Sequence, residues 1–192
     1  VFESVLGHDT AYLVARRGGQ VSGVLPLVLF RSRLFGRSLI SLPFLNYGGM
    51  LVDDDAVGQA LVEAATREGR EFGASHVELR HLTRQCPLLP SREHKLAMTL
   101  SLAATSEAQW TILDRKIRNQ VRKAQKEGLT TAAGGAELID EFYEVFARNM
   151  RDLGTPVYPK ALFRSTVPAF GGSASIVVVR KGTQPITSGF TL

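Results

Sequence analysis

The stretch that decides the fold class is an amphipathic segment at residues 134–156, which reads GGAELIDEFYEVFARNMRDLGTP. Its apolar side chains recur at helical spacing, which predicts a helix from about Ala136 to Leu153. Gly154 is a suitable cap for this helix, and Pro156 prevents it from continuing. The apolar stripe consists of Leu138, Ile139, Phe142, Val145, Phe146 and Met150.

Strands are expected on both sides of this helix. Leu129–Ala133 precedes it, and the apolar runs Ala174–Arg180 and Ile186–Leu192 follow it as two strands around a turn. A second, short helix is expected after Pro159, through Phe163. The C-terminal part of the chain therefore reads as strand, two helices and two strands.

The N-terminal half opens with a predicted hairpin. Its strands are Ala11–Ala15 and Val21–Phe30, and the Gly18-Gly19 pair supplies the turn. Pro26 argues for a sheet edge or a bulge in the second strand, because proline cannot donate a backbone hydrogen bond. The further expected elements are a basic loop Arg31–Arg37, an apolar run Leu39–Leu45, a turn Asn46–Gly49, a short strand Met50–Val52, a helix that starts at Asp53–Asp55 and stops at Gly73, and strands Ser75–Leu82 and Leu96–Leu102.

A single long helix is expected between the two halves, from Ser106 to about Glu127, with Gly128 as its stop. One face of it is apolar and is expected to join a core: Trp110, Leu113, Ile117, Val121 and Ala124. The complete order of elements predicts an α/β fold, of the α+β kind with a mixed sheet.

Composition limits the classes of function. The chain of 192 residues has 23 Lys and Arg against 18 Asp and Glu, a net charge of +5, which suits an anionic small molecule, a nucleotide-linked substrate or RNA. Its longest apolar run, near Val24–Phe30, is about a third of the ~20 residues that a membrane span needs. The single cysteine, Cys86, excludes an intrachain disulfide and fits a reducing compartment, so we expect a cytoplasmic location. No metal-ligand spacing is present, and we expect no bound cofactor.

The strongest candidate site is the basic half of the central helix. Residues 115–126 carry six cations, and the helical wheel places three of them, Arg115, Arg122 and Lys126, opposite Ile117 and Val121, with Arg118 and Lys123 on the flanks. Arginine and lysine in this arrangement can hold phosphate groups, although a solvated helix face would have the same composition. The predicted substrate-binding residues here are Lys116, Arg118, Asn119, Arg122 and Lys123.

Two further groups are weaker candidates. Asn149, Arg151 and Tyr158 crowd a helix end and its loop and could border an acceptor site; alternatively, Arg151 complements the helix dipole and Tyr158 packs. Asn46 and Tyr47 precede two glycines that would let a ligand approach the backbone, although such a sequence is more often a simple turn. No residue is marked out as a catalytic base.

Two segments resemble a known family. Residues 116–129, KIRNQVRKAQKEGL, are similar to the signature of the Fem-like acyltransferases of the GNAT superfamily, in which a basic helix with Arg-Asn and Arg-Lys-Ala precedes a glycine and a strand. Residues 142–158 resemble the Fem-like proteins of PEP-CTERM and exopolysaccharide systems. The resemblance implies tandem GNAT-like units, both incomplete here: the later part of one (1–104), a basic connecting helix (105–128) and the opening part of the next (129–192).

The resemblance also implies an activity. Fem-like enzymes transfer an acyl or aminoacyl group to an amine, so the expected co-substrate is acyl-CoA or aminoacyl-tRNA. The expected acceptor is a small molecule or a nucleotide-linked compound of the cell envelope or of exopolysaccharide biosynthesis. Two alternatives stay open: an RNA- or tRNA-binding module built on the basic helix, and a non-catalytic remnant that self-associates through an open sheet edge after Leu192.

Overall fold

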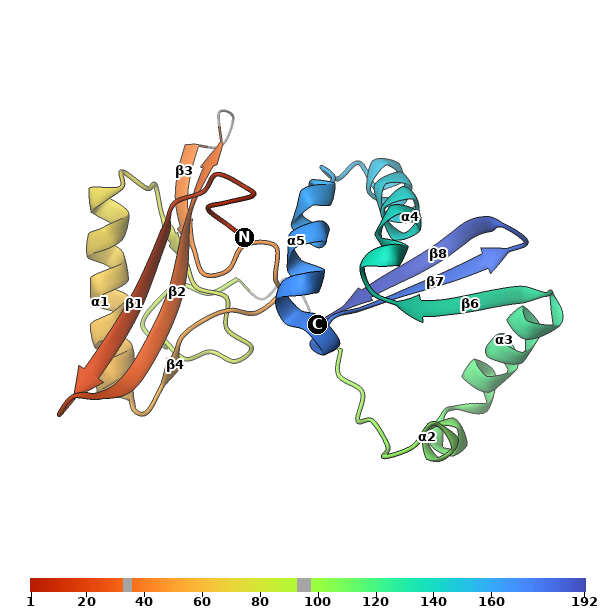
Figure 1. Cartoon of the computed structure of the whole chain (residues 1–192). Helices are drawn as coiled ribbons and strands as arrows, with labels where there is room; N and C mark the ends of the chain where they lie inside the picture. The colour runs from red at the N-terminus through yellow and green to blue at the C-terminus, as the bar shows by residue number, and fades with distance from the viewer. Residues whose placement is uncertain (33–35, 93–97) are drawn as a thin grey trace. The chain divides into compact units, whose positions relative to one another are not determined.

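The computed structural model describes residues 1–32, 36–92 and 98–192 (Figure 1). The chain packs as two compact units, residues 2–98 and 99–192. Each unit has its own sheet and its own hydrophobic core. The expected strand Leu96–Leu102 is wrong where it can be judged, because Met98–Leu102 forms no strand and Met98, Leu100 and Leu102 are exposed; residues 93–97 lie outside the described residues.

The first unit is built on the expected hairpin, β1 (Thr10–Arg17) and β2 (Gln20–Ser32), which are antiparallel. Gly18 and Gly19 have φ values of 57° and 83°, so both positions of the turn need glycine. β3 (Gly36–Ile40) pairs antiparallel with β2, and β5 (Val77–Glu78) pairs parallel with β3, which makes this sheet mixed, as predicted.

Three expectations about this sheet need correction. The basic loop is mostly strand, since β2 reaches Ser32 and β3 begins at Gly36; residues 33–35 lie outside the description. The apolar run after Leu39 leaves the sheet at Ile40, and Leu42 and Phe44 then take positive φ values of 44° and 75°. The strand expected at residues 75–82 is only two residues long, because only β5 meets a partner.

Pro26 occupies an interior strand, contrary to the predicted edge or bulge. β2 pairs with β1 on one side and with both β4 (Leu51–Val52) and β3 on the other. Pro26 lies between the residues that pair with β4 and those that pair with β3. The backbone N–H of Leu29 donates to the Asp9 carbonyl, on the side of β1. Because backbone N–H groups point to alternate sides along a strand, the nitrogen of Pro26 faces the other side, between the part of β2 that pairs with β4 and the part that pairs with β3.

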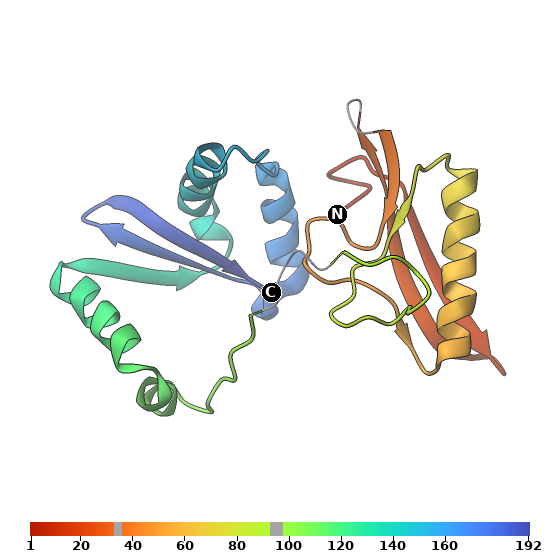
Figure 2. The same ribbon diagram turned by 180° about the vertical axis from the view of Figure 1, so that it is seen from behind.

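Helix α1 (Asp55–Glu71) covers one face of this sheet (Figures 1 and 2). Asp54 caps it by accepting from the backbone of Val57 at 3.0 Å, and Gly73 ends it with a φ of 64°. The core between helix and sheet is made of fully buried leucines of β2 and β3, of apolar residues of α1 and of the methionine that precedes β4. Its members are Leu25, Leu27, Leu29, Leu39, Met50, Val57, Leu61 and Ala65.

The second unit is a three-stranded antiparallel sheet in the order β6 (Leu129–Gly134), β7 (Ser175–Lys181), β8 (Gln184–Thr191). All three strands were expected. A 3₁₀ turn at residues 136–138 leads into α4 (Ile139–Asp152), and α5 (Lys160–Phe170) runs well beyond the predicted end at Phe163. Their apolar side chains pack with the sheet in one aromatic core: Leu138, Ile139, Phe142, Phe163, Val167, Ile176 and Val178.

The expected single helix before β6 is two helices, α2 (Ser106–Ile112) and α3 (Arg115–Lys126). Leu113 is extended, with a ψ of 141°, and Asp114 starts the second helix by accepting from the backbone of Lys116 at 2.6 Å. Neither helix has a buried residue, and Ile117 and Val121 are 43% and 38% exposed. The predicted role of this apolar face in a core is therefore wrong for the residues that the structure describes. In Figures 1 and 2, α2 and α3 lie on the other side of β6 from α4 and α5.

Candidate functional site

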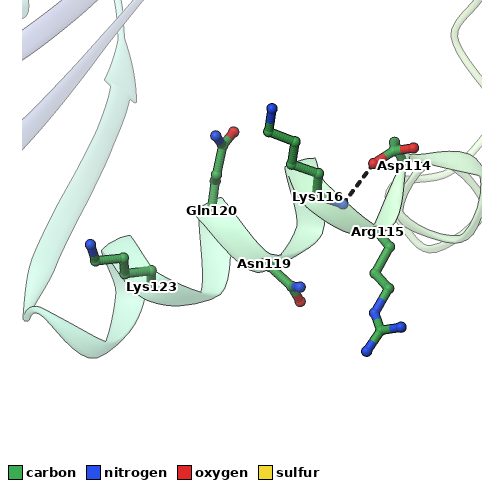
Figure 3. A pocket seen from close by; sticks show the side chains of 6 residues that line it. All are labelled: Asp114, Arg115, Lys116, Asn119, Gln120 and Lys123. Atoms are coloured by element: carbon green, nitrogen blue, oxygen red, sulfur yellow. Dashed lines mark hydrogen bonds between the residues drawn. The ribbon is translucent and has the colours of Figure 1, made fainter.

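Helix α3 presents two rows of polar side chains (Figure 3). Lys116, Gln120 and Lys123 point to one side of the helix, at spacings of four and three residues, while Arg115 and Asn119 point to the other. These five residues, together with Asp114, line an open hollow of about 550 Å³. Helical spacing of about 100° per residue carries the second row on to Arg122 and Lys126. The hollow therefore lies along a surface rich in hydrogen-bond donors.

Most cations of α3 lack a carboxylate partner. In the part of the chain that the structure describes, its one ion pair joins Lys123 to Glu127 at 3.9 Å, between side chains that are 80% and 56% exposed. Elsewhere in the same unit five of the six other Lys and Arg side chains contact a carboxylate, namely Arg148, Arg151, Lys160, Arg164 and Arg180; no ion pair of Lys181 is found among the described residues. The positive charge of this unit is thus concentrated on α3.

Two predicted residues of α3 also have packing roles. The guanidinium of Arg122 lies over the Trp110 ring, 5.5 Å from its centroid, which is a cation–π contact. Arg118 is half-buried, and its Nε is buried without a hydrogen-bond partner among the described residues. Neither residue lines the hollow. Of the five residues predicted on this helix, the hollow brings together Lys116, Asn119 and Lys123.

Sequence reasoning did not include three lining residues, Asp114, Arg115 and Gln120, in the site. Gln120 lies between the two lysines at helical spacing, and this spacing is the signal that could have identified it. Asp114 was missed because the two helices were expected to be one, so no N-cap was sought there.

The second candidate group is not among the residues that line the hollow on α3. Arg151 contacts the neighbouring Asp152 at 2.8 Å and is 75% exposed, and Asn149 is exposed. The Tyr158 ring packs beside Phe146, with 5.9 Å between centroids, and its backbone carbonyl accepts from the Tyr143 hydroxyl at 3.0 Å. Tyr158 therefore has the packing contacts that the alternative interpretation expected, and a substrate role for these residues remains a prediction.

The third group, Asn46 and Tyr47, lies in an exposed loop of the first unit. The glycines that follow them are in contact with the protein itself. Gly48 and Gly49 both donate to the Arg80 carbonyl, and a Cβ at Gly49 would lie 2.1 Å from the His81 ring. His81 Nε2 accepts from the backbone of Met50 at 3.1 Å, and burial lowers the pKa of this ring, which keeps it neutral. These contacts make Gly48 and Gly49 structural, while a binding role for Asn46 and Tyr47 stays untested.

Residues 1–32, 36–92 and 98–192 contain no group of three or more His, Cys, Asp or Glu side chains that lie close enough together to hold a metal ion. No helix in these ranges has the length and apolar character needed to cross a membrane.

Comparison with known proteins gives the class of this fold. Residues 113–192 match a family described as acetyltransferase (GNAT) domain, and this match covers α3 and the whole sheet of the second unit. The match covers 80 of the 192 residues, and the described chain as a whole is mixed α/β.

A solved structure with the same fold is FemX. The two share 19% sequence identity and superpose with a TM-score of 0.54 over 92% of this chain. The chain spans half the length of the FemX chain. A search of curated proteins found no match. The likeness to FemX confirms the Fem-like fold that the sequence predicted.

Proposed function

We propose that this chain is part of a Fem-like acyltransferase that transfers an acyl or aminoacyl group to an amine. The observation that carries this proposal is the match of residues 113–192 to the acetyltransferase (GNAT) domain. The FemX-like fold over both units supports it. The donor would be acyl-CoA or aminoacyl-tRNA, used as a co-substrate.

The chemistry is attack of a neutral amine on an activated carbonyl. It requires that the two substrates be positioned, that one proton be removed from the amine, and that negative charge on the carbonyl oxygen be stabilised. No step needs a nucleophile from the protein. We assign no catalytic base, and we propose that Asn149, Arg151 and Tyr158 border the acceptor. Asn46 and Tyr47 of the first unit are proposed separately as substrate-binding residues.

The acceptor is proposed to be a small or nucleotide-linked amine of cell-envelope or exopolysaccharide biosynthesis, handled in the cytoplasm. The support for this finer proposal is the resemblance of residues 142–158 to the Fem-like proteins of PEP-CTERM systems. The alternative function is an RNA- or tRNA-binding module, which the cations on α3 favour.

Thermal unfolding with candidate ligands tests the proposal. A bound ligand increases the free energy of unfolding, by about 2.7 kcal/mol at a ligand concentration of 100 Kd. The melting temperature rises as a result. We expect a shift with acetyl-CoA or with aminoacyl-tRNA, and a further shift with a UDP-linked amino sugar. Coenzyme A without an acyl group, deacylated tRNA and free UDP are the controls. Cooperative melting without any shift would count against acyl transfer by this chain.

A further inference from the structure

Cations on α3 occur where an isolated helix would disfavour them. Its first turn contains Arg115, Lys116 and Arg118 and no acidic residue, so the negative charge at this positive end of the helix dipole is that of the N-cap, Asp114. Arg118 and Arg122 are four residues apart, as are Arg122 and Lys126, and like charges at this spacing destabilise a helix. No buried residue of α3 offsets this repulsion. An anion held along the helix would remove it.

The geometry limits what this anion can be. Lys116 and Lys123 point to the same side of α3, with the Gln120 amide between them (Figure 3). Seven residues of helix separate the two lysines by about 10 Å along the axis. The second row, from Arg115 to Lys126, is about 16 Å long by the same measure. Both rows are longer than one phosphate group, so a single compact anion would leave most of the cations unmatched.

We propose that α3 is a binding ridge for a chain of phosphate groups, in which Lys116 and Lys123 hold phosphates about 10 Å apart. The ligand class is a linear polyanion, either the phosphodiester backbone of a single nucleic-acid strand or inorganic polyphosphate. Binding is independent of base sequence, because the hollow offers lysine, arginine and amide donors and, among the described residues, no aromatic ring. The one carboxylate of its lining, Asp114, already accepts from the backbone of Lys116. This inference deepens the alternative function proposed above, an RNA-binding module, and does not depend on the acyl transfer.

A membrane surface is the other class of partner for a basic helix, and the structure favours it less. The apolar side of α3 consists of Ile117, Val121 and Ala124, a narrow stripe for insertion among lipids.

The test is fluorescence anisotropy of a labelled uridine decanucleotide with the full chain, over a range of salt concentrations. The variant K116Q/K123Q should bind at least about tenfold more weakly at low salt. Its slope of log K against log salt should be smaller by about 1.4, since each phosphate contact on a single strand contributes about 0.7. Unlabelled polyphosphate should compete with the labelled strand, and UDP should compete poorly.

Two matched variants separate this site from a general effect of charge. R148Q/K181Q removes two exposed cations of the same unit and should change binding less than twofold. K116R/K123R keeps the charges and should retain affinity. Equal loss in K116Q/K123Q and R148Q/K181Q would overturn the proposal. So would UDP binding as tight as that of the decanucleotide, binding to phosphatidylglycerol vesicles in place of the decanucleotide, or no binding by the wild type.

Discussion

Gly49 and His81 show how closely a loop can depend on a residue without a side chain. The His81 ring occupies the space that a Cβ at position 49 would need, and it also accepts a hydrogen bond from the next residue, Met50. The position of the His81 ring is thus fixed both by its close packing against Gly49 and by its hydrogen bond with Met50. The loop that carries Asn46 and Tyr47 is anchored to the first unit at this point.

We expect Gly49→Ala to destabilise the first unit by about 1–3 kcal/mol, because the rigid ring or the backbone must move to admit the methyl group. Gly172→Ala is the control, since no atom lies within 4 Å of the position of its Cβ. Urea unfolding of both variants is the measurement. Equal stability of the two would show that the loop adapts freely.

Glu141 and Arg180 form a second residue-scale contact, with Nη2 and Oε1 separated by 2.7 Å between α4 and β7. The hydrogen bond from Arg180 holds the pKa of Glu141 below its ordinary value of 4.5. Its folded pKa is therefore lower than its unfolded pKa. The stabilisation is complete above about pH 4.5 and is lost as the pH falls through the folded pKa.

We expect Glu141→Gln to melt at a lower temperature than the wild type at pH 7, and this difference to shrink as the pH falls below 4.5. Melting curves between pH 7 and pH 3 measure it. Glu144→Gln removes an exposed pair on the same helix and should have a smaller effect at every pH. If the difference in melting temperature between Glu141→Gln and the wild type stayed constant down to pH 3, the stabilisation could not come from the ionised Glu141 carboxylate beside Arg180.

At the scale of the elements, the sequence predicted the hairpins best and the helix junctions worst. Gly18-Gly19 marks its turn because few other residues adopt its backbone angles. The break between α2 and α3 was missed because the apolar spacing of Trp110, Leu113 and Ile117 continues through it. Periodicity reports which residues are apolar, whereas the break depends on the N-cap at Asp114, an interaction of only about 1 kcal/mol.

The length of β5 was overestimated for a related reason. Alternation at residues 75–82 indicates an extended chain, but a strand also needs a neighbour, and β3 provides one only for Val77 and Glu78. The candidate site, like β5, was only partly predictable from the sequence. The cations of α3 could be found from the sequence, whereas the hollow between Lys116 and Lys123 required the start of the helix to be known.

We expect Asp114→Ala to fray the first turn of α3, since the carboxylate would no longer accept from the backbone of Lys116. Hydrogen exchange at the amides of residues 116–118 should accelerate about fivefold, which corresponds to about 1 kcal/mol. Asp114→Asn keeps a capping acceptor and should retain most of the protection. Unchanged exchange in Asp114→Ala would mean that other contacts hold the start of the helix.

At the scale of the whole molecule, the two cores have no residue in common. The order of elements alone predicted the fold class, but the tandem arrangement came from the resemblance to Fem-like proteins. Neither the spacing of apolar residues nor the distribution of charge predicts at which residue one hydrophobic core ends and the next begins. The boundary after Met98 lies in a region whose alternating pattern resembled a strand.

We expect Phe142→Ala to destabilise the second unit selectively. Phe142 is 4% exposed and contacts the rings of Phe146, Phe163 and Phe190, so its loss should cost about 3–5 kcal/mol. Calorimetry should show a lower transition temperature for this unit and an unchanged transition for residues 2–98. Phe170→Ala, at a ring that is 53% exposed, is the control. A shift of both transitions would mean that the units unfold together.

The absence of buried residues in α3 has a practical consequence. The helix has six lysines and arginines within twelve residues, and its backbone is protected mainly by its own hydrogen bonds. Brief opening of such a helix exposes several bonds that trypsin recognises. Limited digestion should therefore nick the chain between residues 115 and 126, and a bound polyanion should delay that cleavage, so that a protein gel could report occupancy of the ridge.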